Sequence, residues 1–264
     1  TKGIVICIGW RADMKEFDQL VELMATLRGD KGCAWDKRQT TKNFKTFLLE
    51  EVYELIDAIE KDDFNALKEE LGDVLFHIVF ISQICKDEKR FDIKEVVSYV
   101  YKKMYNRHPH VFKDVSPEKP IEKRWEELKK EEKNGYSPLS DVPSSMPALL
   151  RAYILTRRAA HFGFDWDSVD GVYEKIEEEI EEIKGAEKSG NNELIREEIG
   201  DLLFTVVNLS RFHKIDPEDA LRQTCEKFTR RFNYIESKTD LKSVSLSKMD
   251  SLWNEIKDME KKGR

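Results

Sequence analysis

The sequence has few residues of the kinds that build disulfide frameworks, zinc sites or membrane anchors. Its four cysteines form no CxxC pair and no ligand-spaced set with the five histidines, so a structural zinc site is not expected. No apolar run approaches the length that crosses a bilayer. We therefore expect free thiols in a reducing cytoplasm and no contact with a membrane.

An excess of positive charge is also absent. The 264 residues carry a formal net charge of −7, with a pI near 5.5, and this balance disfavours a protein that binds nucleic acid. The 37% of charged residues instead predicts long solvated helix faces, while the 40% of hydrophobic residues suffices for two modest cores. Residues 1–13 lie outside the pattern described below, and the natural chain is expected to begin at Met14.

Strand patterns are scarce, whereas apolar residues recur with helical spacing along almost the whole chain. The spacing predicts helices over residues 16–28, 43–61, 64–86, 92–106, 118–133, 147–160, 168–188, 191–213, 216–237 and 245–262. Six of the seven prolines lie between residues 109 and 147, and we interpret residues 134–146 as a linker. The predicted fold class is all-α.

The chain contains an internal repeat in which matching positions are 128 residues apart. Glu50–Glu54 (EEVYE) recurs as Glu178–Glu182 (EEIEE), and Glu69–Asp73 (EELGD) recurs as Glu197–Asp201 (EEIGD). The register continues to the pair Trp125 and Trp253. The repeat predicts two tandem copies of one helical-bundle domain, at residues 14–133 and 147–264.

Each copy carries two pairs of carboxylates on consecutive predicted helices. Residues three apart on a helix share a face, so each pair points to one place. The predicted metal ligands are Glu51, Glu54, Glu70 and Asp73 in the first copy and Glu179, Glu182, Glu198 and Asp201 in the second. Clustered carboxylates repel unless a cation lies among them or some are protonated. Oxygen ligands without histidine or thiolate favour Mg²⁺, with Mn²⁺ as the alternative.

Two observations bear on a simpler interpretation, a solvated acidic surface. About one residue in five is acidic, so a lone EExxE motif carries little information. The repetition of the whole pattern at one spacing favours the metal site. Gly72 and Gly200 lie inside the predicted helices, at a cost of about 1 kcal/mol each relative to alanine. They indicate either a close helix crossing or room for a ligand.

Basic residues that could bind phosphate are more complete in the second copy. Lys175 lies one turn before Glu179, and Lys227, Arg230 and Arg231 form a basic stripe on a later helix. Beside a metal cluster this stripe favours phosphate binding over a plain solvated face. In the first copy, Phe47 replaces Lys175 and Asn106 replaces Arg230, although Lys103 and Arg107 match Lys227 and Arg231. Tryptophans such as Trp253 either stack on a base or cover a core.

Taken together, these motifs resemble the MazG family of nucleoside triphosphate pyrophosphohydrolases over about residues 14–262. The segments that carry the resemblance are the two EExxE…EExxD sets, Cys33–Thr40, Arg107–Phe112, Gly163–Trp166 and Lys227–Phe232. The resemblance implies an all-α fold whose copies form a homodimer. It also implies Mg²⁺-dependent cleavage of ribo- and deoxynucleoside triphosphates between the α and β phosphates, which gives the monophosphate and pyrophosphate.

The resemblance also implies roles for individual residues of the second copy, the principal catalyst. The implied catalytic set is Glu179, Glu182, Glu198, Asp201 and Lys175, and the implied nucleotide-binding set is Lys175, Glu178, Lys227, Arg230, Arg231 and Trp253. Glu178 or Glu181 would orient the attacking water. Because Phe47 and Asn106 depart from this pattern, the activity of the first site is left open.

Other classes of protein are compatible with parts of the sequence. A di-iron carboxylate bundle needs an ExxH motif on two helices, and no such pair exists here. A nucleotide sensor or scaffold without turnover explains the helices but not the repeated carboxylates with their basic stripe. A base-selective pyrophosphatase for dUTP or modified nucleotides stays open, because base selectivity depends on pocket walls.

Overall fold

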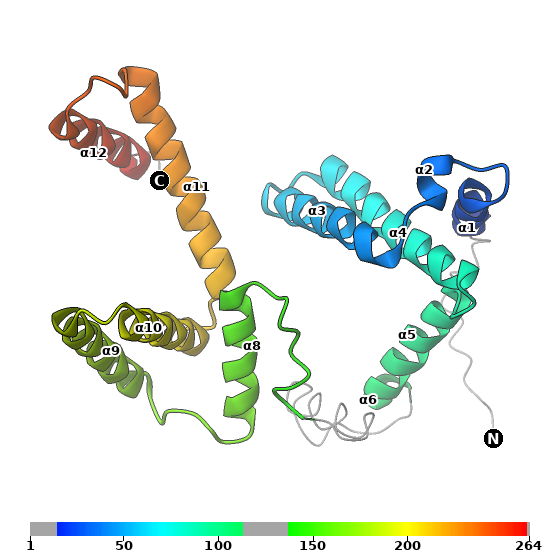
Figure 1. Cartoon of the computed structure of the whole chain (residues 1–264), viewed down its shortest axis with the longest axis horizontal. Coiled ribbons are helices and arrows are strands. Elements are labelled where there is room, and N and C mark those ends of the chain that lie inside the picture. Colours follow the sequence, from blue (N-terminus) through cyan, green and yellow to red (C-terminus); the bar gives the residue numbers. More distant parts are fainter. Residues whose placement is uncertain (1–14, 113–136, 263–264) are drawn as a thin grey trace. The chain divides into compact units, whose positions relative to one another are not determined.

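A computed structural model describes residues 15–112 and 137–262, and all regular structure in these residues is helical (Figure 1). The predicted all-α class is confirmed for this part of the chain. The chain divides into two compact units, residues 1–118 and 119–264. The division, the predicted helix 118–133 and Trp125 all lie outside the described residues, so the predicted domain limits stay predictions. No described helix combines the length and apolar character needed to cross a membrane.

The first unit contains α1 (Lys15–Arg28), α2 (Ala34–Lys37), α3 (Thr41–Glu60), α4 (Phe64–Asp87), α5 (Ile93–Arg107) and α6 (Pro109–Phe112). Side-chain caps fix where the longer helices begin: Thr40 and Asn43 form a capping box at α3, and Asp63 and Asp92 cap α4 and α5. Helices α3 and α4 pack along each other, and α1 packs on α4. The two carboxylate-bearing helices are therefore neighbours.

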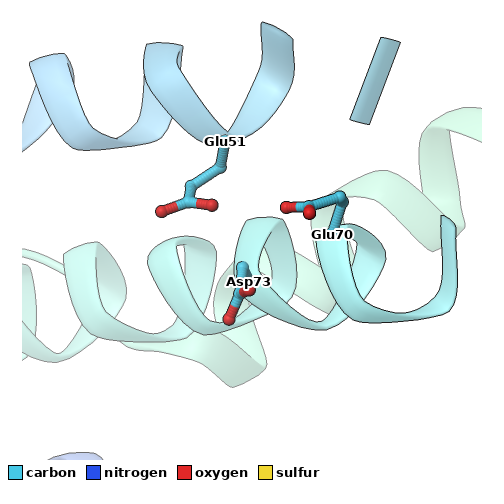
Figure 2. A group of neighbouring side chains, drawn as sticks. All are labelled: Glu51, Glu70 and Asp73. Atoms are coloured by element: carbon cyan, nitrogen blue, oxygen red, sulfur yellow. The ribbon is translucent and has the colours of Figure 1, made fainter. Parts of the chain in front are cut away.

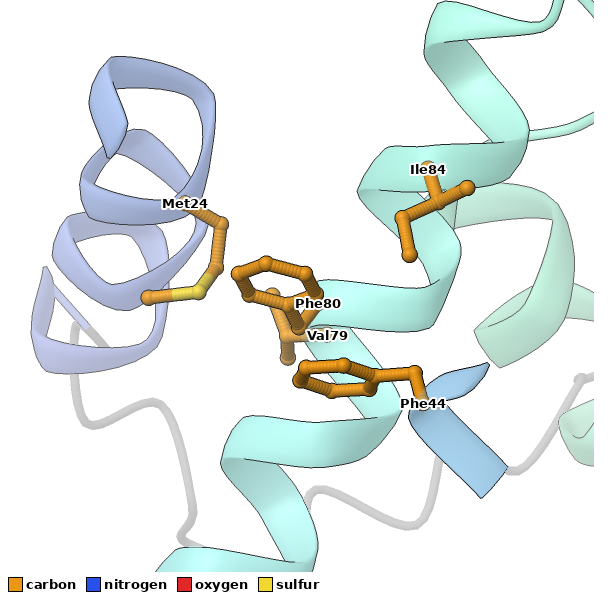
Figure 3. Close-up of a cluster of buried hydrophobic side chains, with 5 residues drawn as sticks. All are labelled: Met24, Phe44, Val79, Phe80 and Ile84. Atoms are coloured by element: carbon orange, nitrogen blue, oxygen red, sulfur yellow. The ribbon is translucent and has the colours of Figure 1, made fainter. Parts of the chain in front are cut away.

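Aromatic side chains fill the core between α1, α3 and α4 (Figure 3). The rings of Phe44 and Phe80 are stacked with centroids 4.3 Å apart, and Met24 packs in the same cluster. The Arg28 guanidinium lies 5.5 Å above the Phe80 ring and pairs with Asp87 at 2.7 Å. This end of the α3–α4 pair is therefore closed by side chains.

The second unit contains α8 (Ala148–His161), α9 (Val169–Ser189), α10 (Asn192–Phe212), α11 (Pro217–Lys238) and α12 (Leu246–Lys262). Helices α9 and α10 form the counterpart of the α3–α4 pair, and α8 packs on α10. Asp216 caps α11 and Pro217 occupies its first turn. Helix α12 folds back along α11, so that Tyr234 bonds to Glu255.

The same backbone turn joins the paired helices in both units. Asp62 and Gly190 are matching positions of the repeat and both have positive φ, 51° and 67°. Their N–H groups donate to the matching carbonyls of Ile59 and Glu187. The repeat thus extends to the local conformation that brings the two helices together.

No other described helix packs closely against the interior glycines Gly72 and Gly200. A Cβ atom at either position would meet nothing within 4 Å in the described part of the chain. Of the two interpretations that the sequence leaves open, this observation supports room beside the helix.

Helices α4 and α10 expose matching apolar stripes. Leu71, Leu75 and Ile78 on α4 are 39–53% exposed, and their counterparts on α10, Ile199, Leu203 and Val206, are 41–53% exposed. The nearly all-round apolar pattern from Val74 to Ile81 predicts that the helix over residues 64–86 is buried in a bundle, yet only the second half of α4 is largely buried. The difference arises because the partners of α4 within its own unit leave this stripe uncovered.

Candidate metal and phosphate site

The structure brings three of the four predicted ligands of the first copy together (Figure 2). Oxygens of Glu51 on α3 and of Glu70 and Asp73 on α4 lie within 4.8 Å of one another, and we call this the first carboxylate group. Burial raises the pKa of the Glu51 carboxyl, although nearby His77 lowers it, and burial also raises the pKa of Glu70. Glu54 is exposed at the edge of the group and adds repulsion to both.

The second copy repeats this arrangement with a slightly different membership. Oxygens of Glu179 and Glu182 on α9 and of Glu198 on α10 lie within 4.8 Å of one another, and we call this the second carboxylate group. Asp201, the fourth predicted ligand, is exposed beside them. Burial, then repulsion from Glu182, Glu179 and Asp201, raises the pKa of Glu198. Both groups therefore favour the arrival of a cation.

Glu179 is the residue that fits a metal ion best. It is 3% exposed, and its Oε2 atom is buried without a hydrogen-bond partner in the described residues. A buried carboxylate oxygen without a partner is costly and calls for a positive charge. Since the second group offers only carboxylate oxygens, its chemistry suits a hard divalent cation such as Mg²⁺.

A cation from the protein already lies among these carboxylates. The Lys175 Nζ atom is 2.7 Å from Glu178, 2.9 Å from Glu179 and 3.9 Å from Glu182. Hydrogen bonds to Glu178 and Glu179 raise the pKa of Lys175 beyond its already basic value. Lys175 is thus a permanent positive charge, placed where it can exchange a carboxylate for a phosphate oxygen.

The first unit has no such cation at the matching position. Phe47 lies there, with its ring centroid 6.0 Å from that of Trp35 and 5.7 Å from that of Phe44. His77 is buried nearby, and its Nδ1 atom is 2.9 Å from the Asp73 carbonyl oxygen. The first carboxylate group is therefore bordered by aromatic rings.

The two residues expected to orient water have different partners. Glu178 is held by Lys175 at the second carboxylate group. Glu181 is exposed and accepts a hydrogen bond from Lys184, which lowers the pKa of Glu181. Both acids pair with a lysine, but only the lysine of Glu178 also contacts the second carboxylate group, which favours Glu178.

Two of the predicted nucleotide-binding residues, Arg230 and Arg231, share one acid that sequence reasoning missed. Arg230 and Arg231 both donate to Glu260 at 2.8–2.9 Å, and Arg231, then Arg230, holds the pKa of that carboxyl below its usual value. The Arg231 guanidinium lies 5.3 Å over the Trp253 ring. No sequence spacing marked Glu260, because it lies on a different helix from the arginines.

Within one chain, this basic cluster is separate from the second carboxylate group. Helix α12 packs on α11, and within the described residues it makes no comparable contact with α9 or α10. The structure therefore assembles two partial sites. One consists of carboxylates with Lys175, and the other consists of Lys227, Arg230, Arg231 and Trp253 on the α11–α12 pair.

Comparison with known proteins supplies a family for this arrangement. The model of the MazG nucleotide pyrophosphohydrolase domain matches residues 39–112 and 168–235, which include both carboxylate groups. The chain is 42% identical over 248 residues to the nucleoside triphosphate pyrophosphohydrolase/pyrophosphatase MazG of Thermotoga maritima, covering 91% of this chain and 95% of that protein. It is 40% identical over 260 residues to the nucleoside triphosphate pyrophosphohydrolase of Escherichia coli, covering 94% and 99%. The corresponding Mycobacterium tuberculosis protein is 35% identical over 133 residues, covering 49% and 41%.

Proposed function

Because the chain belongs to the MazG nucleotide pyrophosphohydrolase family, we propose that it hydrolyses nucleoside triphosphates to nucleoside monophosphates and pyrophosphate. The observation that carries this proposal is the second carboxylate group, where the unpartnered Oε2 atom of Glu179 lies in a cluster that also holds the Lys175 ammonium. Negative oxygens suit a metal ion and an ammonium suits a phosphate, so the two together suit a metal-bound polyphosphate.

The proposed metal ligands are the carboxylates predicted from the repeat. They are Glu179, Glu182, Glu198 and Asp201 in the second unit, and Glu51, Glu54, Glu70 and Asp73 in the first. When bound, Mg²⁺ or Mn²⁺ would offset phosphate charge and lower the pKa of a bound water. Asp201 and Glu54 lie at the edges of their groups, each three residues from a member of the group on the same helix.

The remaining steps fall to residues of the chain. Lys175 exchanges its bond with Glu179 for bonds to phosphate oxygens, and in doing so it stabilises the charge that develops on the transferring group. Glu178, one turn along the same helix, accepts the proton of the attacking water. Lys227, Arg230 and Arg231 bind the outer phosphates, and the nucleotide competes with Glu260 for the two arginines.

We further propose that the active form is a homodimer in which the α11–α12 pair of one protomer covers the α9–α10 pair of its partner. Two observations support this arrangement. The basic cluster and the carboxylates lie apart within one chain, and α10 exposes an apolar stripe that needs a cover. Mixing Glu198→Gln protein with Arg231→Ala protein would restore activity in mixed dimers if the site is shared, and would restore none if each chain works alone.

Product analysis tests the reaction itself. The protein is incubated with Mg²⁺ and a panel of ribo- and deoxynucleoside triphosphates, and monophosphate, diphosphate, pyrophosphate and phosphate are resolved. The expected products are monophosphate and pyrophosphate in equal amounts. Diphosphate with phosphate would mean cleavage at the γ phosphate and would overturn the proposal. Magnesium-dependent binding without any product would indicate a nucleotide sensor.

A further inference from the structure

The second unit contains a cavity of about 540 Å³ to which the proposed function assigns no role. Its walls include Leu155 and Ala159 of α8, Phe164 and Trp166 of the loop before α9, and Phe204 and Asn208 of α10. The three aromatic residues remain 37–83% exposed, so apolar rings face the open space. Ligand pockets are typically roughly 300–1,000 Å³ and mostly apolar with a few polar groups, and this cavity has both properties.

The first unit closes the same place with its own side chains. At matching positions of the repeat, Asn208 replaces Phe80 and Val172 replaces Phe44. In the first unit, Phe80 stacks on Phe44, and Arg28 lies over its ring. The cavity thus arises from the exchange of two large side chains for smaller ones on the same helical framework.

The cavity lies next to the second carboxylate group along α10. Asp201, Phe204 and Asn208 follow one another at spacings of three and four residues, so they share a helix face. Seven residues separate Asp201 from Asn208, which is roughly 10 Å along the axis. A nucleotide whose phosphates lie at the carboxylates can span this distance with its sugar and base.

The loop before α9 approaches from the side of Lys175. A Cβ atom at Gly171, in the first turn of α9, would lie 2.8 Å from the Cδ1 atom of Trp166. The lack of a side chain there lets the indole lie against the helix, one turn before Lys175. The flat face of Trp166 and the phosphate-binding ammonium of Lys175 therefore follow each other along α9.

One wall of the cavity carries a polar group that is held in place. Asn208 is 1% exposed; its Nδ2 atom donates to the Phe204 carbonyl at 3.2 Å, and its Oδ1 atom accepts from Arg211. Arg211 in turn pairs with Asp165, which also lines the cavity. Since an amide has two N–H groups, the second N–H of Asn208 is available, in the described structure, to a hydrogen-bond acceptor inside the cavity.

We propose that this cavity takes the base of the nucleoside triphosphate, with the base lying among Phe164, Trp166 and Phe204 and its edge facing Asn208. The inference rests on the proposed function, because the carboxylates and Lys175 fix where the phosphates lie. It assigns affinity for the base to the second unit alone, since Phe44 and Phe80 occupy the matching place in the first.

Two variants that fill the cavity test this assignment. Ala159→Leu adds a side chain from α8, and Asn208→Phe copies the first unit. Ala160→Leu is the matched control, because Ala160 is the next residue of α8 and does not line the cavity. Calorimetry in Mg²⁺ measures the Kd of α,β-methylene ATP, which has a base but no cleavable α–β bond, and the Kd of inorganic tripolyphosphate, which has no base.

The expected result is a Kd for α,β-methylene ATP that rises about tenfold or more in both filled variants, the scale of a lost pocket contact. The Kd for tripolyphosphate should not change, and Ala160→Leu should change neither value. Circular dichroism identifies a filled variant that does not fold. In that case the Kd values of the other filled variant test the proposal.

Three results would overturn the proposal. An unchanged nucleotide Kd in a folded filled variant would leave the cavity without a role in base binding. An equal rise for nucleotide and tripolyphosphate would mean that the substitution disturbs the phosphate site. Loss of the dimer with an unchanged nucleotide Kd would make the cavity an interface between copies. By contrast, a wild-type protein that neither binds nor cleaves any nucleoside triphosphate would refute the proposed function itself.

Discussion

In the first unit Phe47 occupies the position that Lys175 holds in the second, and this exchange changes the surroundings of two otherwise matching carboxylate groups. Both groups bring together three acidic side chains from two paired helices. Among the described residues, only the second has an ammonium among its oxygens, whereas the first is bordered by Phe47, whose ring contacts those of Phe44 and Trp35. The comparison separates two properties: crowded carboxylates that attract a cation, which both units have, and a lysine among them, the residue that we propose binds phosphate, which the second unit has.

The cavity extends the comparison beyond the charged groups. Asn208 lines a space in the second unit, whereas its counterpart in the first unit, Phe80, stacks on Phe44 and fills the core. The backbones of the paired helices and of their turn correspond, so the smaller side chain at position 208 contributes to the difference. Two copies of one framework therefore differ where a substrate would enter, and the first copy uses that volume for its core.

The largest difference in turnover between the two units is expected when one proposed metal-ligand carboxylate is neutralised in each. Glu198→Gln should reduce pyrophosphate release by on the order of 10³-fold, the scale of losing a group that organises transition-state charge. The matching change in the first unit, Glu70→Gln, should leave most turnover. A steady-state assay of both variants checks this expectation. Equal pyrophosphate release from Glu198→Gln and the parent protein would refute the assignment of catalysis to the second unit.

A second variant removes the lysine that distinguishes the second carboxylate group from the first. Lys175→Met should lower turnover by about 10²-fold, because a charge that stabilises the transferring phosphate is lost. The same variant should bind Mn²⁺ in the absence of nucleotide at least as tightly as the parent, since Lys175 no longer competes for Glu179. Electron paramagnetic resonance titration measures the metal affinity. Weaker Mn²⁺ binding would show that Lys175 supports the metal site rather than competing with it.

A smaller effect concerns the pH dependence of stability at the cluster of Glu260, Arg230 and Arg231 in the second unit; in the first unit, Asn106 replaces Arg230. Arg231 and Arg230 hold the pKa of Glu260 below its ordinary value of 4.5. A lowered folded-state pKa stabilises the protein above pH 4.5, and this contribution is lost as the pH falls through the folded value. Glu260→Gln should therefore lower the thermal midpoint slightly at neutral pH, because an ion pair near the surface contributes little, and the difference should shrink in acid.

Scanning calorimetry at neutral and acidic pH measures this difference. Lys261 serves as a matched control: it is exposed and pairs only loosely with Asp258, at 3.7 Å, so Lys261→Gln should leave the midpoint unchanged at both pH values. A Glu260→Gln midpoint that stays lower by the same amount in acid would mean that packing, not charge, accounts for the effect.

The smallest expected effect lies in the shared turn. Asp62 holds a positive φ that Gly190 adopts without steric cost, so Asp62→Gly should stabilise the first unit by about 1 kcal/mol or less. The reverse change, Gly190→Ala, should destabilise the second unit by about 1 kcal/mol. Urea unfolding measures both. Opposite signs for the two variants are required if the turns are equivalent.

The helices could be predicted from the sequence because their apolar faces are long and regular. Every predicted helix in the described residues begins and ends within about two residues of the observed one. The short helices α2 and α6 were missed because four residues carry no measurable period. The carboxylates were found because the repeat marks them twice and because residues three apart on a helix must share a face.

The rest of the candidate site depends on packing, which the sequence does not encode locally. Lys175 was placed correctly because it shares a helix with Glu179. The separation of α12 from the carboxylates could not be predicted from the sequence, because residue spacing does not determine how two helices joined by a loop are placed relative to each other. The cavity was missed although its signal was present: at position 208 the repeat exchanges a phenylalanine for an asparagine, a loss of volume that becomes a space only when the neighbours do not move in.

The tight turns at Asp62 and Gly190 have a consequence for how the protein folds. Each carboxylate group comes from one helical hairpin, so its acids meet through contacts that are close in sequence. Structures dominated by such local contacts fold quickly, and a hairpin of this kind can form as soon as its second helix leaves the ribosome. The acids therefore approach one another, and repel, when the hairpin forms. The later assembly of the rest of the chain does not have to bring these acids together.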